Sequence, residues 1–204
     1  MCSLCANLNL LMITPSHIIY GWALAKATDQ TPNKPRILAF VLGSFLPDLP
    51  TYLFFFVHTF IWGTSQQLMW DELYFDSVWT PIITLSHSLL LWPLLLLGAT
   101  FLKYKLLQYI SSAALLHVVM DFFVHHDDAY RHFWPVSDWK FFSPLSYYDP
   151  RFFGQWVSLI DAIVIILLLA WLGSRYKTNR AIQITAGLLI ILYVVLQAVQ
   201  LFVF

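Results

Sequence analysis

Residues 106–125 read LLQYISSAALLHVVMDFFVH, a run in which apolar side chains predominate. A helix of about 20 such residues crosses a ~30 Å hydrocarbon core. The same run contains His117, Asp121 and His125, which stand at positions i, i+4 and i+8 and therefore share one helix face. Ionisable side chains inside a membrane are costly unless they meet a cavity, a partner or an ion. This stretch predicts a membrane helix with a functional polar face.

The remainder of the chain has the same apolar character. Of its 204 residues, 59% are hydrophobic and 11% are charged, far from the roughly 25% charged residues of a soluble domain. We predict an all-α, polytopic integral membrane bundle of five to six transmembrane helices, forming one domain over residues 1–204. The other four firm spans are Ile37–Trp62, Pro81–Leu102, Trp156–Gly173 and Ala181–Phe204.

A shorter apolar stretch, His17–Ala27, precedes these spans and either crosses the bilayer, tilts into it or re-enters. Thr14 is predicted to cap this helix, with Pro15 at its first position. Met12 is a candidate natural start. Cys2 and Cys5 form an N-terminal Cys-Ser-Leu-Cys, but no second pair completes a zinc site.

Charge sets the predicted orientation. Three loops, at 26–36, 103–105 and 175–180, hold eight of the eleven Lys and Arg residues, and the positive-inside rule places them in the cytoplasm. The loop from His126 to Gln155 then lies outside the cell, and its aromatic composition predicts an ordered lid. Residues 12–132 form a metal-site half, 133–155 an extracytoplasmic loop and 156–204 two scaffold helices. Zero formal net charge gives no indication of nucleic-acid binding.

Two further polar residues lie in predicted spans. Asp48 stands between Pro47 and Pro50, a break that is tolerated at membrane depth only beside protein or a water-filled cavity. The alternative is a proline kink in which Asp48 binds freed backbone amides. His87 lies inside the outer end of its span, and taken alone it is equally compatible with a hydrogen-bonded helix contact. His117 and Asp121 are open to the same alternative, a buried pair that joins helices.

Together, five residues on four segments supply three imidazoles and two carboxylates, the ligand types of zinc, manganese or iron. They are His17, Asp48, His87, His117 and Asp121. His125 is a further candidate ligand. His126, Asp127, Asp128 and His132 follow in the outer loop, where each alone is more often solvated. His58 has no ligand-like neighbours and is a weaker candidate.

The sequence resembles the family of prokaryotic membrane-bound metal-dependent hydrolases between about Met12 and His132. Its signatures are an N-terminal histidine, a Gly-x-x-x-Pro-Asp element, a Thr-His-Ser-like element and a His-x-x-x-Asp helix. They correspond here to Thr14-Pro15-Ser16-His17, Gly43-Ser44-Phe45-Leu46-Pro47-Asp48, Leu85-Ser86-His87-Ser88 and His117-Val118-Val119-Met120-Asp121. An arginine element that many members carry before Thr-His-Ser is replaced here by Pro81-Ile82-Ile83-Thr84.

The order of these residues is also similar to that of zinc-dependent phospholipase C. This similarity implies that His17, Asp48, His87, His117 and Asp121 bind metal, with His125 or His132 as a further ligand. The late histidine and glutamate of that enzyme have no counterpart, so one or two zinc ions are expected rather than three.

These observations favour a metal-dependent hydrolase of the prokaryotic inner membrane, acting on a lipid or lipid-linked phosphoester. A metal-activated water would attack, Asp128 or a spare histidine would transfer protons, and the site would open outward. The expected partners are membrane lipid and a lipid-like substrate. The alternative is a non-catalytic membrane subunit or a metal- or haem-binding protein, which a Soret absorption band would reveal.

Overall fold

The computed structural model describes residues 3–28 and 34–203, and all regular structure in these ranges is helical. Cys2 and Phe204, which belong to the sequence predictions, lie outside the described residues. The α-helices are α1 (Ser3–Ala27), α2 (Lys34–Phe45), α3 (Leu49–Phe56), α4 (Gln66–Leu68), α5 (Thr80–Ser86), α6 (Leu91–Phe101), α7 (Lys105–Phe122), α8 (Gly154–Arg175) and α9 (Arg180–Val203). Single π-helical turns follow α3 and α4 at Val57–Ile61 and Met69–Leu73, and a 3₁₀ turn at Pro150–Phe152 precedes α8.

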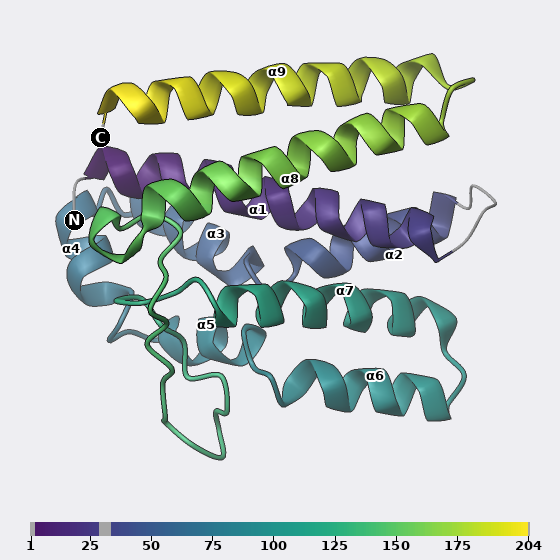
Figure 1. The fold of residues 1–204 in the computed structure, drawn as a ribbon. Helices are drawn as coiled ribbons and strands as arrows, with labels where there is room; N and C mark the ends of the chain where they lie inside the picture. Colours follow the sequence, from purple (N-terminus) through teal and green to yellow (C-terminus); the bar gives the residue numbers. More distant parts are fainter. Residues whose placement is uncertain (1–2, 29–33, 204) are drawn as a thin grey trace.

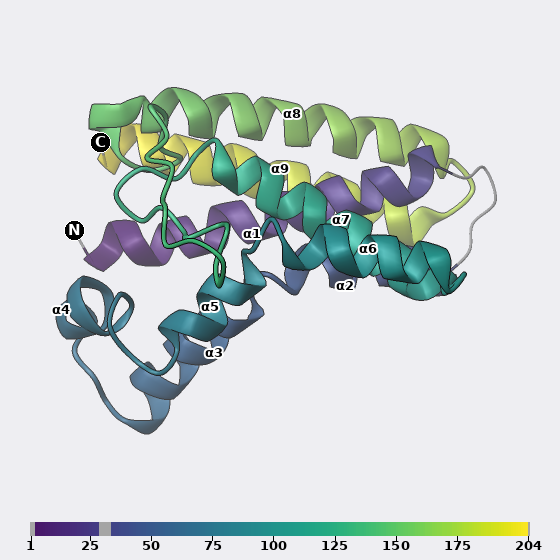
Figure 2. The same cartoon turned by 90° about the horizontal axis from the view of Figure 1, so that it is seen from below.

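Helix α1 lies at the centre of the bundle and packs against α2, α7 and α8 (Figure 1). Helices α8 and α9 pack together on one side of it, and α6 and α7 lie on the other. Figure 2 shows α3, α4 and α5 directed away from this bundle. The apolar contact among α1, α8 and α9 centres on Ile165, Leu169 and Tyr193, each at most 1% exposed.

Two of the predicted spans are sharply bent. The first divides into α2 and α3 with an angle of 62°, and the second into α5 and α6 with an angle of 50°. Pro47 and Pro50 account for the first bend because neither can donate a helical hydrogen bond. At the second bend, the Ser88 hydroxyl accepts hydrogen bonds from the backbone N–H groups of Leu90 and Leu91 and so caps the start of α6.

Large apolar side chains face outward on α6, α8 and α9, including Leu94, Leu167 and Ile191. Among the described residues, α8 and α9 are long and apolar enough to cross a membrane, and the candidate spans number up to four if each bent pair forms one span. The all-α membrane bundle is therefore confirmed, but the predicted five to six spans exceed this number. Helix α7 is not among the candidates, and its sequence includes the polar residues Lys105, Gln108, His117 and Asp121.

The predicted start of the first helix is wrong. Helix α1 begins by Ser3, so Thr14 and Pro15 lie inside it. The Thr14 hydroxyl donates instead to Asp48 Oδ2, at 2.5 Å. Pro15, which has no amide hydrogen to donate, thus lies within the helix. The Thr14 side chain joins α1 to the start of α3.

Two glycines allow close helix crossings. A Cβ at Gly21 of α1 would lie 2.0 Å from Ser44 Oγ of α2, and one at Gly43 of α2 would lie 2.2 Å from the carbonyl oxygen of Ile110 of α7. No side chain fits at either point. These crossings bring three helices together one to two turns from His17, Asp48 and His117.

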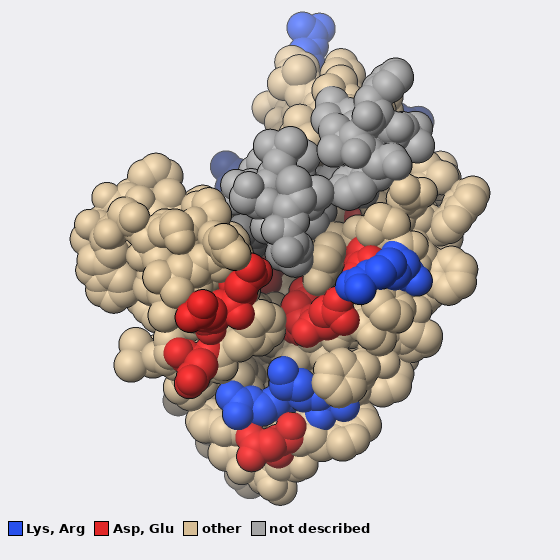
Figure 3. Space-filling model, turned by 90° about the vertical axis from the view of Figure 1, so that its left-hand side faces the viewer, with Lys and Arg blue, Asp and Glu red and all other residues tan. Residues whose placement is uncertain are grey.

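The two ends of the bundle differ in charge. The end of α1, the start of α2, and the α6–α7 and α8–α9 turns lie at one end (Figure 1), and these segments carry the basic loops. Figure 3 faces the opposite end, where acidic side chains gather with fewer basic ones. The acidic residues of the long loop and of the segment after α4 are Asp71, Glu72, Asp76, Asp127, Asp128, Asp138 and Asp149.

The loop from His126 to Gln155 follows a path fixed by hydrogen bonds. Ser143 N–H donates to the carbonyl of His125, and Tyr147 N–H donates to that of Val124. Asp149 accepts hydrogen bonds from Arg151, which hold the pKa of this carboxyl below its usual value. These contacts fix the loop against the end of α7, and its order stays a prediction.

Candidate metal centre

Three separate segments converge on one buried point. Asp48 lies at the break between α2 and α3, His87 at the end of α5, and His117 and Asp121 one turn apart on α7. Ligand atoms of these four residues all lie within 4.8 Å of one another. The three α5 and α7 side chains are at most 2% exposed, whereas Asp48 is partly buried. This cluster could hold a metal ion.

The imidazole Nε2 atoms point at the carboxylates. His117 Nε2 lies 3.0 Å from Asp121 Oδ2 and 3.5 Å from Asp48 Oδ1. His87 Nε2 lies 3.4 Å from the same Asp48 oxygen and 3.6 Å from Asp121 Oδ2. Each of these nitrogens is buried without a hydrogen-bond partner.

The hydrogen bonds of the Nδ1 atoms determine whether each Nε2 carries a proton or a lone pair. His117 Nδ1 donates to the carbonyl oxygen of Ser44 at 2.7 Å, and His87 Nδ1 donates to that of Ile83 at 2.9 Å. A carbonyl oxygen only accepts, so the proton of a neutral ring resides on Nδ1 and the Nε2 lone pair faces the carboxylates. Lone pairs directed at negative oxygens are unfavourable unless a proton or a metal cation lies between them. The donor set therefore fits a divalent metal.

The second oxygen of Asp121 faces a different pair of histidines. His17 Nε2 lies 3.0 Å from Asp121 Oδ1, and His125 Nε2 lies 3.7 Å from it. His17 is 4% exposed and its ring stacks on that of His117 at 3.7 Å. Asp121 thus lies between two groups of imidazoles.

Asp128 lies behind His125, on the side away from Asp121. Its Oδ2 accepts from His125 Nδ1 at 2.8 Å, and its Oδ1 is buried without a partner. Asp128 also lines a loop-side pocket of about 160 Å³ that includes Arg131 and Lys140. It is therefore placed to orient His125 and to reach the loop side of the site.

The other histidines lie outside the cluster. His132 donates from Nδ1 to the carbonyl of His87 at 2.9 Å, and burial lowers its pKa to about 4, so it is neutral near pH 7. His126 donates to the carbonyl of Ser143. His58 contacts Thr64 and packs against Phe54, away from the site.

Sequence reasoning missed three partners of the cluster. They are the Thr14 hydroxyl on Asp48, the Ser44 carbonyl on His117, and the ring of Tyr130, which stacks on His87 at 3.9 Å. Thr14 belonged to the stretch matched to the family signature but was interpreted as a helix cap. The Ser44 carbonyl and the Tyr130 ring have no local sequence signal.

A family model described as YdjM inner membrane protein matches residues 12–202. The chain therefore belongs to this family. No curated protein and no solved structure matches the chain.

Proposed function

We propose that this member of the YdjM inner membrane protein family is a membrane-embedded, metal-dependent hydrolase of a lipid or lipid-linked phosphoester. The observation that carries the proposal is the arrangement of His87 and His117. Both rings are fixed through Nδ1 by backbone carbonyls, and both turn unpartnered Nε2 atoms toward two carboxylates. Metal-ligating histidines commonly have this second hydrogen bond.

The donor set suits zinc, in one or two ions. Asp48, His87, His117 and Asp121 Oδ2 would hold the first ion, and Asp121 Oδ1 with His17 and His125 would hold a second. A bound zinc ion supplies Lewis acidity and lowers the pKa of its water toward 7. Oxygen and nitrogen donors with no thiolate agree with a catalytic rather than a purely structural ion.

Asp128 is the proposed proton acceptor, since its Oδ1 has no partner and it lines the loop-side pocket. Arg131 and Lys140 in the same pocket would attract the negative charge of a phosphoester. Asp128→Asn should retain metal, because the amide oxygen still accepts from His125, and should lower turnover by about a hundredfold or more. Turnover that stays within a few fold of the wild type would restrict Asp128 to positioning His125.

The site is proposed to open to the extracytoplasmic side. The basic loops lie at the opposite end of the bundle, and the positive-inside rule places that end in the cytoplasm. A Lys140→Cys variant in a background free of Cys2 and Cys5 should react with a membrane-impermeant maleimide on intact cells. Reaction only after cell lysis would reverse the orientation.

Elemental analysis of the detergent-purified protein tests the central proposal. We expect near-stoichiometric zinc in the wild type, and its loss in Asp48→Ala and His117→Ala. His58→Ala is the matched control, because it removes a buried histidine outside the cluster. Stoichiometric metal that persists in both cluster variants would contradict the proposal, and a Soret band would favour the haem-binding alternative.

A further inference from the structure

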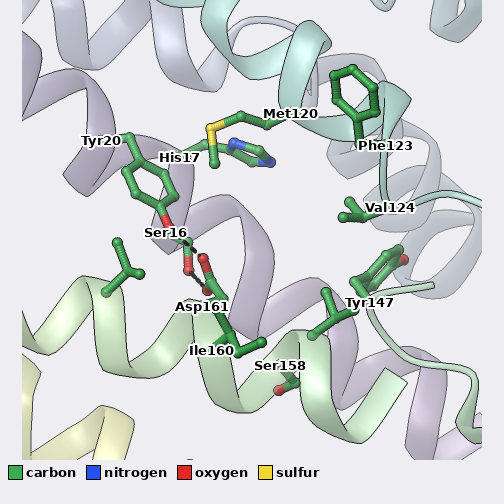
Figure 4. A pocket seen from close by; sticks show the side chains of 12 residues that line it. Ser16, His17, Tyr20, Met120, Phe123, Val124, Tyr147, Ser158, Ile160 and Asp161 are labelled. Carbon is green, nitrogen blue, oxygen red and sulfur yellow. Dashed lines mark hydrogen bonds between the residues drawn. The ribbon is translucent and has the colours of Figure 1, made fainter. Parts of the chain in front are cut away.

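A second cavity adjoins the metal centre and lies among α1, α7, α8 and the long loop. Its volume is about 320 Å³, within the range of small-ligand sites. Figure 4 shows that apolar side chains form most of its wall, with His17 on one side. The lining residues are Ser16, His17, Tyr20, Met120, Phe123, Val124, Tyr147, Val157, Ser158, Ile160, Asp161 and Val164.

The wall offers little to a charged ligand. None of the lining residues is Lys or Arg, so a phosphate group has no cationic partner there. Asp161, the one carboxylate, accepts from the hydroxyls of Ser16 at 2.5 Å and Tyr20 at 2.7 Å. These internal hydrogen bonds, drawn in Figure 4, direct the polar atoms at one another instead of at a ligand. This lining therefore suits a hydrocarbon ligand.

The cavity opens sideways onto the outer surface of the helices. Three of its apolar lining residues are also well exposed, namely Phe123 at 56%, Ile160 at 60% and Val164 at 37%. Ile160 and Val164 belong to α8, which is long and apolar enough to cross a membrane. Because the surface of a membrane-spanning helix faces acyl chains, such an opening would connect the cavity to the bilayer interior.

His17 joins the cavity to the metal centre. Its ring lines the cavity, and its Nε2 lies 3.0 Å from Asp121. Met120, the residue before Asp121, lines the cavity as well. A molecule with an apolar chain and a polar end would therefore place the chain in the cavity and the polar end at the cluster.

We infer that this cavity binds one hydrocarbon chain of a membrane lipid, which enters from the bilayer between α7 and α8. The statement that the bound lipid is a substrate rests on the proposed function, whereas the binding of the chain does not. The cavity recognises the hydrocarbon chain, and the headgroup lies outside the cavity.

Photocrosslinking in detergent tests this inference. The purified protein is incubated with a limiting amount of phosphatidylethanolamine that carries a diazirine at mid-chain, irradiated and digested. We expect the cross-links to concentrate on the lining residues of α7 and α8, and excess unlabelled phosphatidylethanolamine to compete with them. Cross-links spread evenly over α6, α8 and α9 would indicate only the general lipid-facing surface and would overturn the inference.

A pair of adjacent substitutions sharpens the test. Val164→Trp should fill the cavity and lower cross-linking by roughly tenfold, equivalent to about 1.4 kcal/mol of binding. Ile163→Trp, on the neighbouring lipid-facing position at 49% exposure, should leave it unchanged. Equal cross-linking in the two variants, with both melting like the wild type, would refute the cavity as the binding site.

The metal variant separates this inference from the proposed function. His117→Ala should lose metal and turnover yet retain cavity cross-linking, because its side chain does not line the cavity. Cavity cross-linking without any zinc in the wild type would end the hydrolase proposal alone. Zinc and turnover without cavity cross-linking would end the lipid-chain inference alone.

Discussion

The bundle contains two carboxylate clusters that differ in their partners. Asp121 faces imidazoles, and its Oδ1 and the Nε2 atoms of His17 and His117 have no hydrogen-bond partner. Asp161 faces hydroxyls, and both of its oxygens accept hydrogen bonds from Ser16 and Tyr20. Ser16 also contacts the hydroxyl of Tyr193, which extends this second cluster from α1 and α8 to α9.

The difference shows how the role of a buried carboxylate can be judged. Hydroxyl donors satisfy Asp161 completely, so it needs no ion and joins three helices. The Nδ1 proton of His117 is directed at a backbone carbonyl, so a neutral His117 ring donates no hydrogen bond to Asp121, and the cluster could hold a cation. The first arrangement stabilises a fold, and the second is suited to bind something that the chain does not supply.

The largest expected effect comes from removing the shared carboxylate of the metal centre. Asp121→Ala should weaken zinc binding by more than roughly 100-fold, since loss of a mere supporting partner already costs 10–100-fold. Asp161→Ala should keep stoichiometric zinc. Elemental analysis after dialysis against a weak chelator measures the zinc content of both variants. A similar zinc loss in the two variants would remove the distinction between the clusters.

The metal cluster should also depend on the helix crossing that assembles it. Gly43→Ala forces α2 away from the backbone of Ile110, so zinc affinity should fall by roughly tenfold although no ligand has changed. Gly98→Ala in α6 is the matched control, because a Cβ there meets nothing within 4 Å. If Gly43→Ala binds zinc like the wild type, the crossing tolerates more separation than the structure indicates.

The hydroxyl cluster should affect stability instead of metal content. Asp161→Ala removes the carboxylate acceptor of the Ser16 and Tyr20 hydroxyls and should lower the free energy of unfolding by about 1–3 kcal/mol. Thermal melting in detergent monitors this loss, and the zinc content of the folded fraction should not change. A variant that melts like the wild type would show that Asp161 does not join the helices.

Removal of a single hydroxyl should have a smaller effect on the free energy of unfolding. Tyr20→Phe removes one hydrogen bond to Asp161 and retains the ring, so we expect a loss of about 1 kcal/mol. Ser16 still donates to the other oxygen of Asp161. A melting temperature as low as that of Asp161→Ala would mean that the Tyr20 hydroxyl supplies all the stabilisation of the Asp161 cluster.

The smallest effect concerns a third carboxylate, in the loop. The folded pKa of Asp149 is lowered by hydrogen bonds from Arg151, so its contribution is present above the unfolded value of 3.8 and is lost as pH falls through the folded value. Asp149→Asn should remove this pH dependence of loop order and leave the zinc content at pH 7 unchanged. Amide hydrogen exchange of residues 146–154 measures this pH dependence. It is followed in the variant and in the wild type from pH 5 down to the lowest pH at which the protein stays folded. An identical acid response in both proteins would contradict the assignment.

The sequence indicated which polar residues cluster better than it indicated what surrounds them. The spacing of His117 and Asp121 on one helix and the prolines around Asp48 are local signals, and the structure brings these residues together with His87 and His17. The 50° bend at His87 and the backbone acceptors of the imidazoles were not predicted, because they arise from contacts between distant segments. Asp161 was assigned to anchoring scaffold, and nothing near it in the chain indicates its partners Ser16 and Tyr20.

The limited apolar character of α7 has a consequence for biogenesis. A helix that carries His117 and Asp121 enters lipid less readily on its own, since an aspartate at the centre of a span opposes insertion by about 2.5–3.5 kcal/mol and by less toward its end. Its close crossing with α2 at Gly43 offers the polar face a protein surface. We therefore expect α7 to leave the insertion machinery together with helices made before it, and the metal centre to form only after that joint release.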